Sequence, residues 1–230
     1  MVTEESVFFL SDDLMLEGTL SYNQDLPRGP GVILCPPHPH LGGNMENNIV
    51  TTLHHFLAAK GFISLRFNYR GVGNSQASDV HEKEDLKTFW EDSWTPEDDL
   101  KVQDVLSALN FLKEIPGVMD DCIFLVGYSF GAYLSVKAAG KGSRVKGLIV
   151  IAPTVHFHDF TYLNRCSLPK YVISSDDDFS YSLGELKKTY AAFCQPKALD
   201  IFEGVDHFFI GCEEAVASKV AQFMLDHSRE

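Results

Sequence analysis

The chain has 230 residues, of which 45% are hydrophobic and 12% aromatic; this fits one folded domain and excludes a disordered chain of low hydrophobicity. Its 32 acidic residues outnumber 19 basic ones, which gives a formal charge of −13. Binding to a nucleic-acid backbone needs clustered Lys and Arg, so we expect no nucleic-acid partner.

The predicted elements alternate along the chain, strands with helices, after an initial pair of strands. Strands are predicted over Ser6–Leu10, Leu14–Tyr22, Gly31–Cys35, Phe62–Phe67, Ile123–Val126, Val145–Ile151, Lys170–Ser174 and Lys197–Phe202. Helices are predicted over Met45–Ala59, Glu97–Glu114, Ala132–Ala139, Gly184–Phe193 and Glu213–Asp226. The order predicts an α/β fold with an antiparallel hairpin followed by a mostly parallel, eight-stranded sheet, with helices on both faces. Residues 1–230 form a single domain in this interpretation, without a separate lid domain.

An acidic insertion at about 75–95 interrupts this alternation and carries both tryptophans, Trp90 and Trp94. A loop of this length inside a compact domain is usually functional or disordered. Two interpretations stay open: the insertion docks a partner or caps a pocket, or it is a solvated acidic loop packed through its tryptophans.

The five cysteines form no CxxC pair, and the first residues lack the basic start of a secretory signal. No apolar run reaches the roughly 18 residues that a membrane span requires. We therefore expect a cytoplasmic protein with reduced thiols and no membrane partner.

The most informative motif is G-x-S-x-G at Gly127, Ser129 and Gly131, which lies between a predicted strand and a predicted helix. Such a sharp turn exposes a serine as a nucleophile and points the next N–H, that of Phe130, to the place where an oxyanion develops. The alternative is a Gly-rich turn with a capping serine. The strand and helix on either side favour the nucleophile.

A serine nucleophile needs a base, and His207 follows the last predicted strand, where a loop leaves the carboxyl edge of the sheet. The acid is expected after the strand that ends near Ser174, where Asp176, Asp177 and Asp178 stand in a row. We prefer Asp178, because two or three turn residues are needed for the carboxylate to reach back to the histidine. Asp206 is a further competitor.

The loop from Cys35 to Met45 is expected to supply the second oxyanion donor, with His40 or Leu41 as the amide because proline has no N–H. The His38-x-His40 and His156-x-His158 pairs also suggest a metal, but no third ligand is evident, so we expect neither metal nor cofactor. As residues lining the substrate pocket we take Leu41, Tyr128, His156, Trp90 and Trp94.

Four segments of the chain resemble a known family: PHPHLGGNMEN from Pro37, RFNYRGVGNS from Arg66, GYSFG from Gly127 and DHFF from Asp206. They are similar to the small, lidless bacterial serine hydrolases of the α/β-hydrolase superfamily and, more distantly, to prolyl oligopeptidase catalytic domains and dienelactone hydrolases. The resemblance implies an α/β-hydrolase fold in which Ser129 is the nucleophile, His207 the base and Asp178 the acid. Here Ser175 replaces a glycine of the family pattern, and the insertion at about 75–95 is longer than the family loop.

The sequence therefore predicts a carboxylesterase-like serine hydrolase that cleaves a small acyl substrate through an acyl-enzyme. The alternatives are a thioesterase or an aminopeptidase-like peptidase with the same three residues, and a non-catalytic binding protein on the same fold. A small-molecule acyl substrate is the expected partner, and a homodimer is left open.

Overall fold

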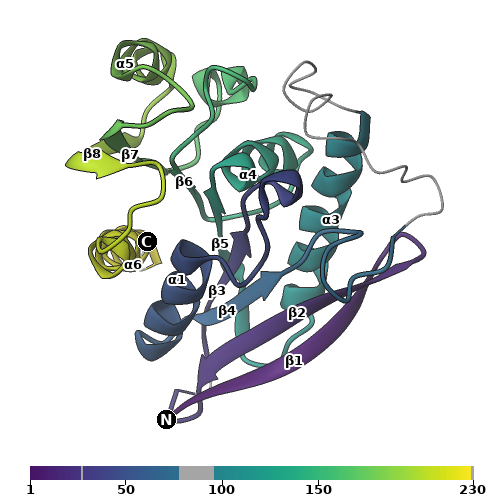
Figure 1. Cartoon of the computed structure of the whole chain (residues 1–230). Helices are drawn as coiled ribbons and strands as arrows, with labels where there is room; N and C mark the ends of the chain where they lie inside the picture. Colours follow the sequence, from purple (N-terminus) through teal and green to yellow (C-terminus); the bar gives the residue numbers. More distant parts are fainter. Residues whose placement is uncertain (27, 78–95, 229–230) are drawn as a thin grey trace.

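A single eight-stranded sheet forms the centre of the molecule (Figure 1). The computed structural model describes residues 1–26, 28–77 and 96–228. Most of the expected insertion, with Trp90 and Trp94, lies outside these ranges. The strand order is β1-β2-β4-β3-β5-β6-β7-β8. The strands are β1 (Val2–Ser11), β2 (Leu14–Asn23), β3 (Gly29–Cys35), β4 (Ile63–Phe67), β5 (Val118–Tyr128), β6 (Gly147–Ile151), β7 (Lys170–Asp177) and β8 (Lys197–Asp206).

The pairing of the strands confirms the predicted sheet. β1 pairs antiparallel with β2 over their whole lengths, and β2 pairs antiparallel with β4. All the pairs from β4 to β8 are parallel. Because parallel strands end at the same edge, the segments that follow β3, β5, β6, β7 and β8 come together at one side of the molecule.

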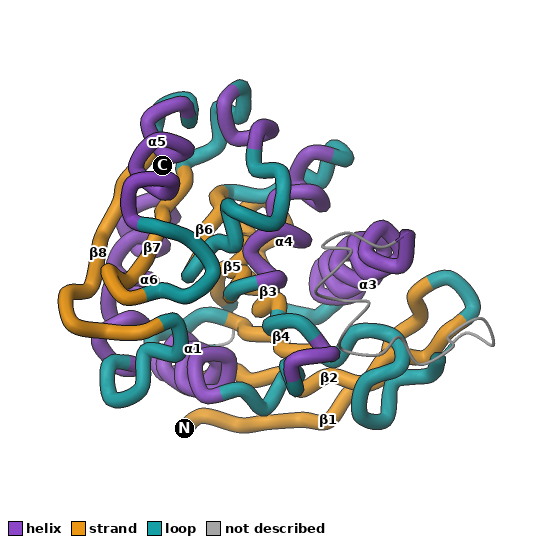
Figure 2. The backbone as a smooth tube through the Cα atoms, turned by 45° about the horizontal axis from the view of Figure 1, so that its top comes forward, coloured by secondary structure: helices purple, strands orange, loops and turns teal. Residues whose placement is uncertain are grey.

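Helices cover both faces of the sheet, as Figures 1 and 2 show. They are α1 (Asn48–Ala59), α3 (Pro96–Lys113), α4 (Phe130–Gly140), α5 (Leu183–Ala192) and α6 (Glu213–Ser228). Helices α1 and α6 bury one set of strand side chains, and α3 and α4 bury the other. Strand β3 shows the alternation, because Val32 and Leu34 belong to the first core and Ile33 and Cys35 to the second.

Several element boundaries differ from the sequence-based predictions. Strand β1 begins at Val2 rather than Ser6, because its charged first half still pairs with β2 at the sheet edge. Strand β5 begins at Val118 rather than Ile123 and passes through two exposed aspartates. Helix α1 begins at Asn48 rather than Met45, since the side chain of Asn47 caps it by accepting the N–H of Ile49 at 3.0 Å.

The connection between β6 and β7 contains one short 3-10 helix, η2 (Thr161–Asn164), so no lid domain is inserted there. A second short 3-10 helix, η1 (Pro39–Leu41), forms the loop after β3. Among the residues that the structure describes, no helix combines the length and apolar character needed to cross a bilayer.

Candidate active site

Ser129 occupies a strained turn between β5 and α4. Its φ of 56° and ψ of −118° lie in a region that side-chain-bearing residues rarely adopt, and its N–H donates to the Ile151 carbonyl at 2.8 Å. The flanking glycines make the turn sterically feasible. A Cβ on Gly127 would collide with the Gly131 carbonyl, and one on Gly131 would collide with the Cys35 carbonyl. The turn therefore holds the serine side chain at the carboxyl edge of the sheet.

The structure brings Ser129, His207 and Asp178 into one hydrogen-bonded chain. His207 Nε2 lies 3.0 Å from Ser129 Oγ, and His207 Nδ1 lies 2.7 Å from Asp178 Oδ2. The side chains of His207 and Asp178 are 4% and 0% exposed. Water is thus largely excluded from the carboxylate–imidazole contact, and the imidazole has a fixed orientation towards the serine hydroxyl.

The other three aspartates considered from the sequence have no side-chain hydrogen bond to His207. Asp176 Oδ1 accepts the N–H of Gly204 at 2.8 Å, and Asp206 Oδ1 accepts the N–H of Phe208 at 2.9 Å. Asp177 is the last residue of β7 and is exposed. Asp178 is the first residue beyond the strand, where the chain turns back towards the histidine.

Hydrogen bonding keeps Asp178 ionised despite its burial. Burial alone would raise the pKa of this carboxyl, but the hydrogen bonds from His207 and Ser180 outweigh that effect and hold the pKa below its usual range. Asp178 Oδ1 accepts both the N–H of Ser180, at 2.8 Å, and its hydroxyl, at 2.7 Å. The two carboxylate oxygens therefore have separate partners.

The expected oxyanion donors differ in their availability. The Phe130 N–H is at the first position of α4, where helical amides point outward without an intrahelical partner. Of the two amides expected as the second donor, the His40 N–H donates to His38 Nδ1 at 3.1 Å inside the turn of η1, and the Leu41 N–H donates to the His38 carbonyl at 3.1 Å. For the His40 N–H to bond a ligand, its hydrogen bond to His38 must be shared or exchanged.

The neutral ring of His38 underlies that turn. Burial, with a contribution from nearby Lys101, lowers the pKa of His38 to about 2, and burial lowers the pKa of His158 to about 4. The ring centroids of His38 and His158 lie 4.3 and 5.5 Å from that of Phe130. In the described ranges, no three His, Cys, Asp or Glu side chains are grouped so that they could hold a metal ion.

Tyr128, expected to line the substrate pocket, is largely shielded from solvent. Its side chain is only 2% exposed and lies beneath His207, with ring centroids 5.7 Å apart. Its hydroxyl donates to the His207 backbone carbonyl at 2.9 Å. Tyr128 therefore fixes the loop that carries the histidine.

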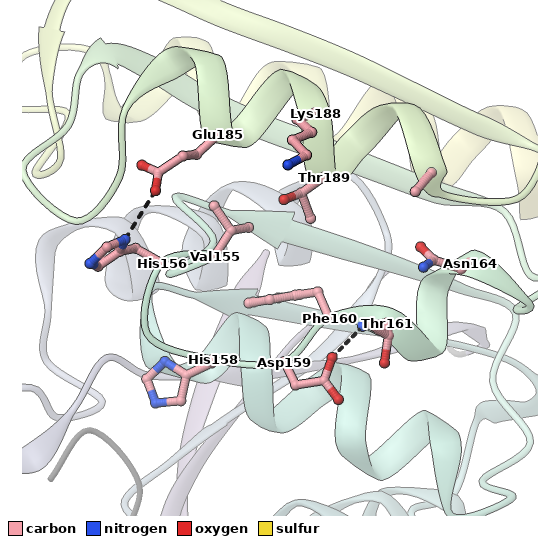
Figure 3. Close-up of a pocket in the computed structure, with 11 residues that line it drawn as sticks. Val155, His156, His158, Asp159, Phe160, Thr161, Asn164, Glu185, Lys188 and Thr189 are labelled. Carbon is pink, nitrogen blue, oxygen red and sulfur yellow. Dashed lines mark hydrogen bonds and ion pairs between the residues drawn. The ribbon is translucent and has the colours of Figure 1, made fainter.

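His156 lines a cavity of about 450 Å³ between the segment 155–164 and α5 (Figure 3). Its Nδ1 lies 3.1 Å from Glu185 Oε1 across that cavity. The lining described for this cavity includes neither Ser129 nor His207. Leu41, on η1, is 47% exposed, and Trp90 and Trp94 lie outside the described residues.

Sequence reasoning missed two groups of residues. Asn68 accepts the N–H of Met45 at 2.8 Å and donates to Glu17, so the RFNYRGVGNS segment anchors the loop that precedes α1. Phe179 and Phe208 are exposed beside His207. The sequence signal that could have identified these two residues is their position directly after Asp178 and His207.

Comparisons with known proteins bear on the family and the fold of the chain. A sequence profile of the dienelactone hydrolase family matches residues 17–225. An α/β serine hydrolase homologue from Coxiella burnetii is 28% identical and superposes with a TM-score of 0.79 over 95% of this chain and 96% of that chain. An α/β serine hydrolase without a lid from Xanthomonas campestris is 23% identical, with a TM-score of 0.78 over 97% of this chain and 94% of that chain, and shows the shared fold. The predicted α/β-hydrolase fold and the lidless resemblance are confirmed.

One relative has a longer chain and is named for an enzymatic activity. The mitochondrial palmitoyl-protein thioesterase ABHD10 of Bos taurus is 28% identical over 137 residues. The match covers 59% of this chain and 37% of that protein, so the chain spans well under half of its length.

Proposed function

Because the chain belongs to the dienelactone hydrolase family and has the α/β serine hydrolase fold, we propose that it hydrolyses a small carboxylic ester through Ser129, His207 and Asp178. The observation that carries the proposal is the continuous chain of hydrogen bonds from the Asp178 carboxylate through His207 to the hydroxyl of Ser129. A serine hydroxyl is a weak nucleophile at neutral pH, and this arrangement supplies the base that activates it.

The reaction proceeds in two halves. His207 Nε2 accepts the Ser129 proton as Oγ attacks the ester carbonyl carbon, and the resulting imidazolium then gives that proton to the departing alkoxide. The C–O bond to the alcohol breaks and an acyl-serine ester remains. Water, activated by the same nitrogen, hydrolyses this ester and restores Ser129. Asp178 stabilises the imidazolium and keeps the proton of the neutral ring on Nδ1.

The tetrahedral intermediate carries its charge on the former carbonyl oxygen. The Phe130 N–H at the start of α4 is the first donor to that oxygen, and the positive end of the helix dipole adds to it. The second donor is the His40 N–H, which exchanges the neutral imidazole of His38 for the oxyanion. The exchange costs little, because a weak neutral acceptor is replaced by a charged one.

The proposal is tested with p-nitrophenyl acetate and butyrate. Ser129→Ala is expected to lower kcat about a million-fold, since removing this nucleophile abolishes the acyl-enzyme route and leaves only the residual rate that binding and the oxyanion donors support. Ser135→Ala is the matched control, because Ser135 is a buried serine of α4, the helix that follows Ser129, and its hydroxyl donates to the Ala132 carbonyl. Equal rates in wild type and Ser129→Ala contradict the proposal and favour a non-catalytic binding protein.

A thioester is the second candidate substrate, motivated by the similarity to the thioesterase ABHD10. The same three residues cleave thioesters, whose thiolate leaving group needs less protonation than an alkoxide. Comparing kcat/KM for matched butyrate esters and thioesters separates the two. A ratio that favours the thioester by more than tenfold, after correction for its intrinsic hydrolysis rate, assigns the chain to thioester hydrolysis.

A further inference from the structure

Two exposed phenylalanines flank the proposed base. Phe179 follows Asp178 and is 56% exposed, and Phe208 follows His207 and is 49% exposed. The ring centroids of Phe179 and Phe208 lie 4.7 and 5.7 Å from that of His207, and 5.9 Å from each other. Large apolar side chains at this exposure, grouped around one polar residue, are unusual on a protein surface unless they bind something.

The backbone holds both rings outward. On the Phe179 side, the amide and hydroxyl of Ser180 both bond Asp178 and close the turn. On the Phe208 side, the N–H of Phe208 donates to Asp206, and its carbonyl accepts from Asn48 Nδ2 at 3.1 Å. The next residue, Phe209, is fully buried. The exposure of the two rings is therefore a fixed feature of the site.

The position of the rings relative to His207 decides which part of a substrate they meet. His207 must reach the leaving oxygen to protonate it, so the alcohol portion of an ester lies against the imidazole. The carbonyl oxygen points the other way, to the Phe130 amide at the start of α4. Groups that surround the imidazole thus contact the alcohol rather than the acyl chain.

Resting on the proposed ester hydrolysis, we propose that Phe179 and Phe208 bind the alcohol portion of the substrate and select an uncharged, apolar or aromatic alcohol. Exposed carboxylates support the exclusion of anionic alcohols. Asp177 and Asp206 are exposed and lie two residues before Phe179 and Phe208, on a chain with a net charge of −13. A leaving group that carries phosphate or carboxylate meets repulsion at this face.

The experiment uses acetate esters of ethanol, 1-butanol and 2-phenylethanol, which share one acyl group and therefore one deacylation step. kcat/KM reports acylation, in which the alcohol is still bound. Phe179→Ala and Phe208→Ala are each expected to lower kcat/KM for 2-phenylethyl acetate three- to tenfold, the range of one aromatic contact, and for ethyl acetate less than about twofold. The ratio of the two esters within one variant does not depend on the amount of folded protein.

Phe8→Ala is the matched control, because Phe8 is 53% exposed on the edge strand β1. It should leave the ratio of 2-phenylethyl to ethyl acetate unchanged. A 2-phenylethyl acetate with a para-carboxylate is expected to react more slowly than the neutral ester, with a gap that narrows as salt is added.

Two outcomes overturn the inference. Equal losses on ethyl and 2-phenylethyl acetate mean that the rings only shield the His207–Asp178 hydrogen bond. If the loss of kcat/KM in the two variants grows with acyl length across p-nitrophenyl acetate, butyrate and hexanoate, the rings contact the acyl chain instead. Failure of the underlying hydrolysis is distinguishable, because wild type would then cleave none of these esters.

Discussion

Replacing Asp178 by Asn tests how the hydrogen-bond chain works, because the structure dictates how the new amide sits. Asp178 Oδ1 accepts two donors from Ser180, and Oδ2 accepts from His207 Nδ1. The Asn oxygen must occupy the Oδ1 position, since the NH₂ group cannot accept the two Ser180 donors. The NH₂ group then faces His207 Nδ1, so the ring proton moves to Nε2, and that nitrogen can no longer accept the Ser129 proton.

The expected loss follows from this wrong tautomer. The corresponding change in serine proteases lowers kcat about 10⁴-fold, or about 5 kcal/mol of transition-state stabilisation. Butyrate ester hydrolysis measures the loss. Asp177→Asn is the matched control, because Asp177 is one residue earlier and exposed. It should retain activity within about twofold.

Two results would refute the reasoning. An Asp178→Asn variant within tenfold of wild type means that this carboxylate does not set the tautomer. A loss in Asp177→Asn or Asp176→Asn as large as that in Asp178→Asn means that the acidic turn acts through its total charge and not through one hydrogen bond.

Two further predictions concern stability. The pKa of Asp178 is lowered in the folded state, so its contribution to stability is present above pH about 4 and is lost as the pH falls further. Between pH 5 and 3, the Tm of wild type should therefore fall more than that of Asp178→Asn. Parallel curves of Tm against pH for the two proteins would argue against this. Asp104→Ala should cost about 3–5 kcal/mol in urea unfolding, because it leaves the buried Arg70 guanidinium, 2.7 Å away, without its main partner. Asp12 pairs with the same guanidinium but is 54% exposed, so Asp12→Ala should lower the free energy of unfolding by under about 1 kcal/mol. Similar losses of stability in both variants would contradict the account.

The serine and the histidine could be predicted from the sequence because their signals are local. The turn at Ser129 lies at a single junction between a strand and a helix. This turn needs a glycine on each side of the serine, so its signal lies within a few residues. The position of His207 after the last strand follows from chain order. The structure then brings the two side chains to 3.0 Å across 78 residues.

The choice among three adjacent aspartates depended on where β7 ends, which a run of identical residues does not reveal. Asp177 is still in the strand and exposed, and Asp178 is the first residue to turn back. The preference for Asp178 rested on the length of the turn, and the hydrogen bond to His207 agrees with it.

Tyr128 and His40 show why the remaining site residues were harder to predict. Both lie next to informative motifs, but what each does depends on tertiary contacts. Tyr128 is buried under the histidine loop, and the amide of His40 is taken by the ring of His38, two residues away. Neither contact has a sequence signature.

The central claim is that Ser129 is a nucleophile activated by His207, and labelling with a fluorophosphonate tests it most directly. Wild type should gain one phosphonyl group, and peptide mass spectrometry should place it on Ser129. His207→Ala should slow the labelling by several orders of magnitude, and Ser135→Ala should label like wild type. An unmodified wild-type protein, or a label on any other residue, would contradict the account.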